Sequence, residues 1–133
     1  MRLLLDTSAI IDFVENGNPR VAGLISKAEE VYTSSICAYE ALVGDKYIEL
    51  KGRGSKVDFS EFFERISNLD FTYQDAKVAS RITAELMLKG KKIDDFDVLI
   101  AAQALNMDAV LLTQNKKDFD TIKEYTGLKI EVF

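Results

Sequence analysis

The chain contains no histidine among its 133 residues. Histidine is the usual general base near neutral pH and a common zinc ligand. A Ser-His-Asp triad, a Cys-His pair, a histidine-based ribonuclease and a histidine zinc site are therefore all excluded. Any chemistry must use carboxylates, hydroxyls, lysine or arginine.

Cysteine and proline are almost as scarce, with one residue of each. Cys37 has no partner for an internal disulfide, which is typical of a reducing compartment, and its apolar neighbours indicate a small core residue. No apolar run approaches the ~18 residues of a membrane-spanning helix, and the N-terminus does not have the pattern of a signal peptide. We expect a cytoplasmic protein without a membrane segment.

The composition is that of a globular protein, with 47% hydrophobic and 29% charged residues. A chain of this length fits one domain, so we expect a single domain over residues 1–133. The net charge of −5 argues against a nonspecific nucleic-acid coat protein. It is compatible with an enzyme that acts on nucleic acid at one local site.

Strand-length apolar runs alternate with helical patterns along the chain. The predicted strands are 2–6, 31–33, 69–72, 110–113 and 129–132. The predicted helices are 7–15, one that begins at Asn18-Pro19, 35–50, 59–66, 75–89, 94–107 and a short one at 119–125. This alternation indicates an α/β fold, a parallel sheet of about five strands flanked by helices on both faces. The segment Lys51–Lys56, which holds two glycines, is predicted to be an exposed loop.

Four carboxylates stand where this fold can bring them to one edge of the sheet. Asp6 ends the first strand, and Asp118 follows the fourth. Asp97 lies in the first turn of a predicted helix that is apolar nearly all round, so this turn should point into the fold. Glu40 lies about one and a half turns into another helix. Ligands of open parallel sheets gather beyond the carboxyl ends of the strands, so one acidic site is possible there.

Each of these acids also has a structural explanation. Asp6 could simply cap the helix that follows it, and Asp118 could be a turn residue. Negative charge is favoured at helix N-termini, which is sufficient to explain Asp94 and Asp95. The structural explanation is weakest for Glu40, because an ionised glutamate among apolar residues is rarely buried without a partner.

Two further groups of residues leave alternatives open. The helical spacing of Phe59, Phe62, Phe63 and Ile66 favours a core or a partner groove over a nucleobase-stacking platform. Five lysines near the acids could contact phosphate or could equally be solvated surface: Lys89, Lys91, Lys92, Lys116 and Lys117.

Four segments, in this order, resemble the signatures of the PIN-domain family and especially its small VapC-type toxins: LLLDTSAIIDF, SSICAYEALVG, GKKIDDFDVLIAAQAL and LLTQNKKDF. The resemblance runs from about residue 3 to 130. It implies a PIN-like three-layer sandwich, a parallel sheet between helices, and RNA cleavage that depends on Mg²⁺ or Mn²⁺. The catalytic and metal-binding acids that it implies are Asp6, Glu40, Asp97 and Asp118, with Ser8, Thr113 and Asn115 as substrate-positioning residues. Asp94 stands where relatives often have proline, and it either adds charge near the metal or merely caps the helix.

The implied chemistry agrees with the residues present. Carboxylate oxygens are hard ligands suited to Mg²⁺ and Mn²⁺, and without histidine a metal-activated water is the expected nucleophile. The resemblance also implies an RNA substrate, a homodimer and a cognate antitoxin whose C-terminal segment fills a groove beside the site. Two alternatives to a toxin stay open, a housekeeping RNA-processing nuclease with the same motifs and a PIN-like binding module without activity.

Overall fold

The computed structural model of the protein describes residues 1–54 and 57–133. Its frame is a sheet of five strands in the order β3-β2-β1-β4-β5, in which all neighbours are parallel. The strands are β1 (Arg2–Leu5), β2 (Glu30–Ser34), β3 (Ser67–Leu69), β4 (Val110–Thr113) and β5 (Lys129–Val132). The predicted parallel α/β sheet is confirmed.

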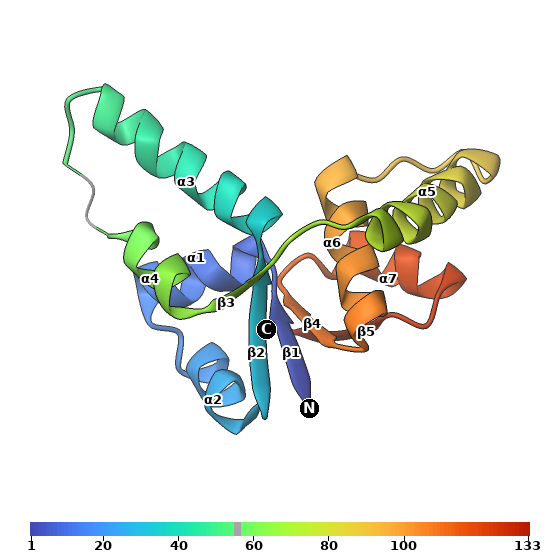
Figure 1. Cartoon of the computed structure of the whole chain (residues 1–133), viewed down its shortest axis with the longest axis horizontal. Coiled ribbons are helices and arrows are strands. Elements are labelled where there is room, and N and C mark those ends of the chain that lie inside the picture. The colour runs from blue at the N-terminus through green and yellow to red at the C-terminus, as the bar shows by residue number, and fades with distance from the viewer. Residues whose placement is uncertain (55–56) are drawn as a thin grey trace.

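Helices cover both faces of this sheet, as predicted (Figure 1). One layer consists of α1 (Thr7–Asn16), α2 (Pro19–Lys27), α3 (Ser35–Leu50) and α4 (Phe59–Arg65), and the other of α5 (Tyr73–Leu88), α6 (Asp95–Met107) and α7 (Lys116–Tyr125). Strands β1 and β2 run upward in Figure 1, so their carboxyl ends lie between α3 and α6. The chain leaves the sheet at this point to enter α1 and α3.

The core is centred on β1, which pairs with β2 on one side and β4 on the other. Leu3, Leu4 and Leu5 are fully buried because helices cover both faces of this central strand. Cys37 is fully buried too, and burial raises the pKa of its thiol to about 12. It is the small core residue that its neighbours predicted. Phe59 and Phe63 are also buried, so the core prediction for their helix is confirmed.

The third strand and the helix after it begin earlier than predicted. The predicted bounds of the third strand, 69–72, are wrong, since β3 begins at Ser67 and ends at Leu69. Thr72 instead caps α5: its hydroxyl accepts a hydrogen bond from the backbone N–H of Asp75, and the Asp75 carboxylate accepts one from the N–H of Thr72. This capping box starts the helix at Tyr73 rather than at residue 75.

Side-chain caps also set the start of α6 and α7. The Asp94 carboxylate accepts a hydrogen bond from the N–H of Phe96, at 2.9 Å, so α6 begins at Asp95. Asn115 caps α7, which begins at Lys116 rather than at the predicted Phe119. The predicted helix was too short because the pattern of apolar residues begins later than the cap.

The loop predicted at Lys51–Lys56 is described only in part. Its first four residues, 51–54, are exposed, as predicted, and Ser55 and Lys56 lie outside the described residues. Within the described ranges, none of the helices combines the length and the apolar character needed to cross a membrane.

Candidate active site

Asp6 stands between the end of β1 and the start of α1. Its carboxylate accepts hydrogen bonds from the Ser8 hydroxyl (2.6 Å), the Ala9 N–H (3.0 Å) and the Thr113 hydroxyl. Asp6 therefore does cap α1, as its structural explanation proposed. It is also only 5% exposed and faces β4, and this burial raises the pKa of Asp6 while the hydrogen bonds act to lower it. A cap alone does not require such burial.

Thr113 and Ser8 tie the loop after β4 to the start of α1. The Thr113 hydroxyl donates to Asp6 and accepts from the N–H of Asn115 at 3.0 Å. The Ser8 hydroxyl donates to Asp6 and accepts from the N–H of Gln114 at 3.0 Å. Each hydroxyl both donates and accepts, so together they fix two loops around one buried carboxylate.

Asn115 joins the two acids that lie furthest along the chain. Its side-chain nitrogen donates to Asp97 at 3.1 Å and to Asp118 at 3.2 Å. Its side-chain oxygen accepts from the N–H of Asp118, so the same residue caps α7. Because one amide contacts the first turns of α6 and α7, the two carboxylates are held at one place.

Glu40 comes from α3 and is held by a residue that sequence reasoning missed. The Thr7 hydroxyl donates to Glu40 Oε1 at 2.7 Å. One indication in the sequence that Thr7 belongs to the site is its position between the predicted site residues Asp6 and Ser8. Its partner was not predictable, because the contact depends on how closely α1 approaches α3, and these helices are joined only through α2 and β2.

The electrostatics of Asp97 show that the acids lie within range of one another. The pKa of Asp97 is raised from 3.8 to about 7, first because the carboxyl is partly buried and then because negative charges surround it. Those charges belong to Asp94, Asp6, Asp118 and Glu40. Like charges at short range disfavour ionisation, so the four predicted acids and Asp94 form one cluster. The two explanations given for Asp94 were alternatives; it does cap α6, and its charge also acts on Asp97.

Positive charge does not compensate this cluster. Within residues 1–54 and 57–133, none of the ion pairs of lysine or arginine includes Asp6, Glu40, Asp97 or Asp118. Two of the five nearby lysines have other partners, since Lys116 pairs with Asp120 and Lys91 lies 3.5 Å from Glu124. The remaining three, Lys89, Lys92 and Lys117, are exposed.

The donor set of the cluster suits a hard divalent cation, since it consists of carboxylate oxygens with excess negative charge. As the side chains stand, no group of three or more aspartate, glutamate or cysteine residues in the described ranges is placed to hold an ion. Mg²⁺ is commonly bound through one or two carboxylates and several waters, so a group of three is not required. Asp6 Oδ2 accepts a hydrogen bond from Thr113, and a carboxylate oxygen has two acceptor sites.

Comparison with known proteins identifies the family and the fold. The family described as PIN domain matches residues 3–125. The chain belongs to the PIN-domain family. Ribonuclease VapC19 of Mycobacterium tuberculosis is 32% identical over 120 residues, which cover 87% of this chain and 90% of that protein. The tRNA(fMet)-specific endonuclease VapC of Shigella flexneri is 26% identical over 132 residues, covering 98% and 97%.

A solved structure agrees with this PIN-domain assignment. The crystal structure of DNA-bound VapBC from Salmonella typhimurium has a chain that matches with a TM-score of 0.82 and 25% identity, covering 99% of this chain and 98% of that one. The resemblance inferred from the four sequence segments is therefore confirmed. The roles of individual site residues stay predictions.

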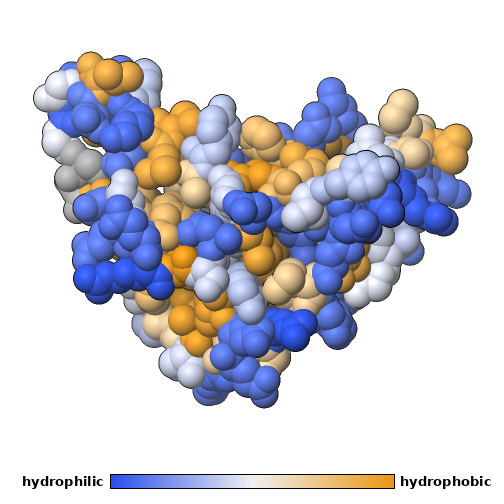
Figure 2. All heavy atoms as spheres, in the orientation of Figure 1, coloured by the Kyte–Doolittle hydropathy of each residue, from blue (hydrophilic) through white to orange (hydrophobic). Residues whose placement is uncertain are grey.

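A cavity of about 720 Å³ opens beside the acidic cluster of this PIN-domain protein. It lies between α1, α3 and the start of α4, and Glu40 is one of its lining residues, with Ile11, Ala41, Ile48 and Phe59 on its apolar walls. In space-filling view the molecule has a V-shaped outline, and hydrophobic side chains show on both of its arms (Figure 2). Helices α3 and α5 end at Leu50 and Leu88, which are 87% and 86% exposed.

Proposed function

We propose that this PIN-domain protein is a metal-dependent endoribonuclease and the toxin of a toxin–antitoxin pair. One observation carries the proposal: acids from four separate elements meet at the carboxyl end of the sheet, and no lysine or arginine of the described residues pairs with them. Uncompensated negative charge of this kind favours a divalent cation, which can in turn bind a phosphate. The relatives named ribonuclease VapC and the VapBC structure support the same function.

The proposed ligands of Mg²⁺ or Mn²⁺ are Asp6 and Asp97 directly, Glu40 directly or through a water, and Asp118 more loosely. When bound, such a cation supplies an activated water and offsets the charge that develops on the phosphate. The protein's own contribution is to hold the carboxylates. Asn115 orients Asp97 and Asp118 through its amide, and Thr7 orients Glu40 through its hydroxyl.

In this proposal the predicted positioning residues Ser8, Thr113 and Asn115 orient the acids and do not contact the substrate. Ser8 and Thr113 use their hydroxyl protons on Asp6, so they cannot donate those protons to RNA in the same arrangement. Asn115 likewise uses both N–H bonds of its amide on carboxylates. They therefore place the metal ligands, and the substrate is positioned by the ligands and the cation.

We also propose the site at which the antitoxin acts. The cavity beside Glu40 has apolar walls of the kind that take one face of an amphipathic helix, and it opens next to the acidic cluster. A basic side chain from a segment in this cavity can reach the carboxylates and compete with the cation. The exposed hydrophobic residues on α3 and α5 support the expected homodimer, and the continuous sheet supports a single PIN domain over residues 1–133.

The decisive experiment is an RNA cleavage assay with protein purified free of any partner. Structured RNAs, with an initiator tRNA first because one relative is named for it, are incubated with Mn²⁺, with Mg²⁺ or with EDTA. We expect endonucleolytic cleavage with either cation, none in EDTA, and none when saturating antitoxin is added. An Asp97→Asn preparation made in the same way controls for contaminating nuclease. Undiminished cleavage in EDTA by the wild type, absent from the control, would contradict the proposed mechanism.

A further inference from the structure

Two aromatic side chains meet directly beside the acidic cluster. Tyr39 of α3 immediately precedes Glu40, and Phe96 of α6 immediately precedes Asp97. Their ring centroids are 5.8 Å apart and their planes meet at 78°, an edge-to-face contact. Because α3 and α6 belong to opposite helical layers, this contact spans the gap at the carboxyl ends of the strands.

Both rings are open to solvent where RNA would approach. Tyr39 is 59% exposed and Phe96 is 37% exposed, although each neighbours a partly buried acid in the chain. In an edge-to-face pair, the ring that presents its edge keeps both of its faces clear of its partner. A flat base can therefore stack on this pair without separating it.

The carboxylates at this place do not attract RNA, so electrostatic attraction of the phosphate depends on the bound cation or on the exposed lysines. The charged groups that act on Asp97 are carboxylates, which repel phosphate, and the paired lysines of the region hold other acids. Stacking of a base on an aromatic ring is independent of charge and is tolerant of sequence. We propose that Tyr39 and Phe96 form a stacking site for an unpaired RNA base next to the scissile phosphate. This inference rests on the proposed ribonuclease function.

Three other aromatic residues on α3 and α4 differ from this pair in burial or position. Phe63 is buried in the core, and Phe59 is buried on the wall of the cavity proposed for the antitoxin, so neither ring stands free beside the acidic cluster. Tyr47 is also on α3, about two turns further on than Tyr39, and is 58% exposed. It is distant in the chain from any acid of the cluster, and Lys51 already lies over its ring. Tyr47 is therefore a matched control, equal in type and exposure but not in position.

The experiment separates stacking from cleavage. A short unstructured oligoribonucleotide containing one 2-aminopurine is mixed with the full chain and Mn²⁺, and fluorescence quenching is followed before turnover. We expect Tyr39→Ala and Phe96→Ala each to reduce the quenching and to raise KM about tenfold with little change in kcat, because the stacked base contributes to binding and takes no part in the chemical step. Tyr39→Phe and Phe96→Tyr keep a ring and should behave as wild type, and so should Tyr47→Ala.

The possible failures are distinguishable. One outcome is that the wild type cleaves no RNA but quenches the probe, and that each alanine variant loses this quenching. In that case the ribonuclease function fails and the stacking site stands. If it cleaves RNA and both alanine variants keep their quenching and KM, the stacking site is refuted and the nuclease stands. Equal losses in Tyr47→Ala would also overturn the proposal, and so would a change in the sedimentation of Tyr39→Ala without a change in quenching, which would assign the ring to a protein interface.

Discussion

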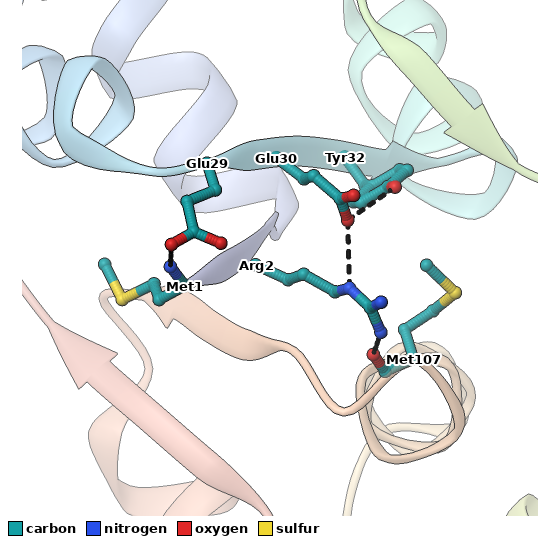
Figure 3. Close-up of polar contacts among 6 residues, drawn as sticks. All are labelled: Met1, Arg2, Glu29, Glu30, Tyr32 and Met107. Carbon is teal, nitrogen blue, oxygen red and sulfur yellow. Dashed lines mark hydrogen bonds and ion pairs between the residues drawn. The ribbon is translucent and has the colours of Figure 1, made fainter.

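The two ends of the sheet differ in how their acidic side chains are held. At the amino end the acids have positively charged partners, and at the carboxyl end they have neutral ones. At the amino end, Arg2 donates to Glu30 at 2.9 Å and to the carbonyl of Met107 at 2.9 Å, and the Tyr32 hydroxyl donates to the same glutamate (Figure 3). The terminal amine of Met1 pairs with Glu29 close by. At the carboxyl end, hydroxyls and an amide hold the acids, and the charges stay uncompensated.

This difference separates a structural role from a binding role. The Arg2 contacts join the starts of two strands to the end of α6, so they hold the frame without needing a ligand. A hydroxyl or amide orients a carboxylate but leaves its charge available to a cation. The carboxyl end is therefore less stable than it could be, a common cost of a functional site.

The largest expected effect comes from removing one charge at the carboxyl end. Asp6→Asn can keep the helix cap, because asparagine caps helices about as well as aspartate, but it weakens the cation site. We expect cleavage to fall at least about 100-fold, the melting temperature without metal to equal or exceed that of wild type, and most of the Mn²⁺-induced rise in melting temperature to disappear.

Asp108→Asn is the matched control for this substitution. Asp108 lies at the amino end, pairs with Lys129 and has a positive φ of 50°, which asparagine also tolerates. Its cleavage and its Mn²⁺ response should be unchanged. Retention of both by Asp6→Asn as well would show that Asp6 is only a cap.

The pH dependence of stability should have opposite signs at the two ends. In metal-free protein the pKa of Asp97 is about 7, above its ordinary value of 3.8, so the folded state binds the proton more tightly than the unfolded chain. Its contribution to stability is full below pH ~4 and is lost as pH rises towards ~7. In thermal unfolding with EDTA, the melting temperature of Asp97→Asn should therefore rise relative to that of wild type as the pH increases over this range.

Asp108 provides the reverse case. The hydrogen bond and charge of Lys129 lower the pKa of Asp108, so its contribution is present above pH ~4 and is lost as pH falls through the lower folded value. Asp108→Asn should be slightly less stable than wild type at neutral pH, and this difference in stability should disappear in acid. The same sign for both variants would remove the distinction between the two ends.

The smallest effect is expected at Arg2. Its ion pair with Glu30 is about half exposed on both sides, and exposed pairs contribute roughly 0.2–1 kcal/mol. Arg2→Met should therefore lower the free energy of unfolding by no more than about 1 kcal/mol, as measured in urea, and leave kcat and KM unchanged. A large loss of cleavage would mean that the amino end also positions the acids.

The sequence was sufficient for features that depend on local pattern. Three consecutive leucines before Asp6 predicted a buried strand that places Asp6 at its carboxyl end, and the structure has this arrangement. Helix starts were less accurate, because the capping box of Thr72 and the cap of Asn115 lie outside the apolar pattern. The Thr7–Glu40 contact depends on the packing of α1 against α3, which no spacing along the chain encodes.

The convergence of the acids was predictable only from the parallel fold and the family resemblance. The size of the pKa shift at Asp97 was not, since its first cause is burial, and burial depends on the whole packed structure. The sequence left the five lysines undecided between phosphate contact and solvated surface. Lys91 and Lys116 have surface acids as partners, a choice that depends on side chains of α7.

The bond between Thr113 and Asp6 has a consequence for synthesis of the protein. It joins residues 107 positions apart, and β1 pairs with β4 across a similar separation. Domains generally acquire such distant contacts only when most of the chain is present. A nascent chain still attached to the ribosome would carry Asp6 long before the strand that fixes it exists. The acidic cluster would therefore be fixed in place only after β4 has been synthesised, and until then the Asp6 carboxylate would lack the Thr113 hydroxyl that donates to it.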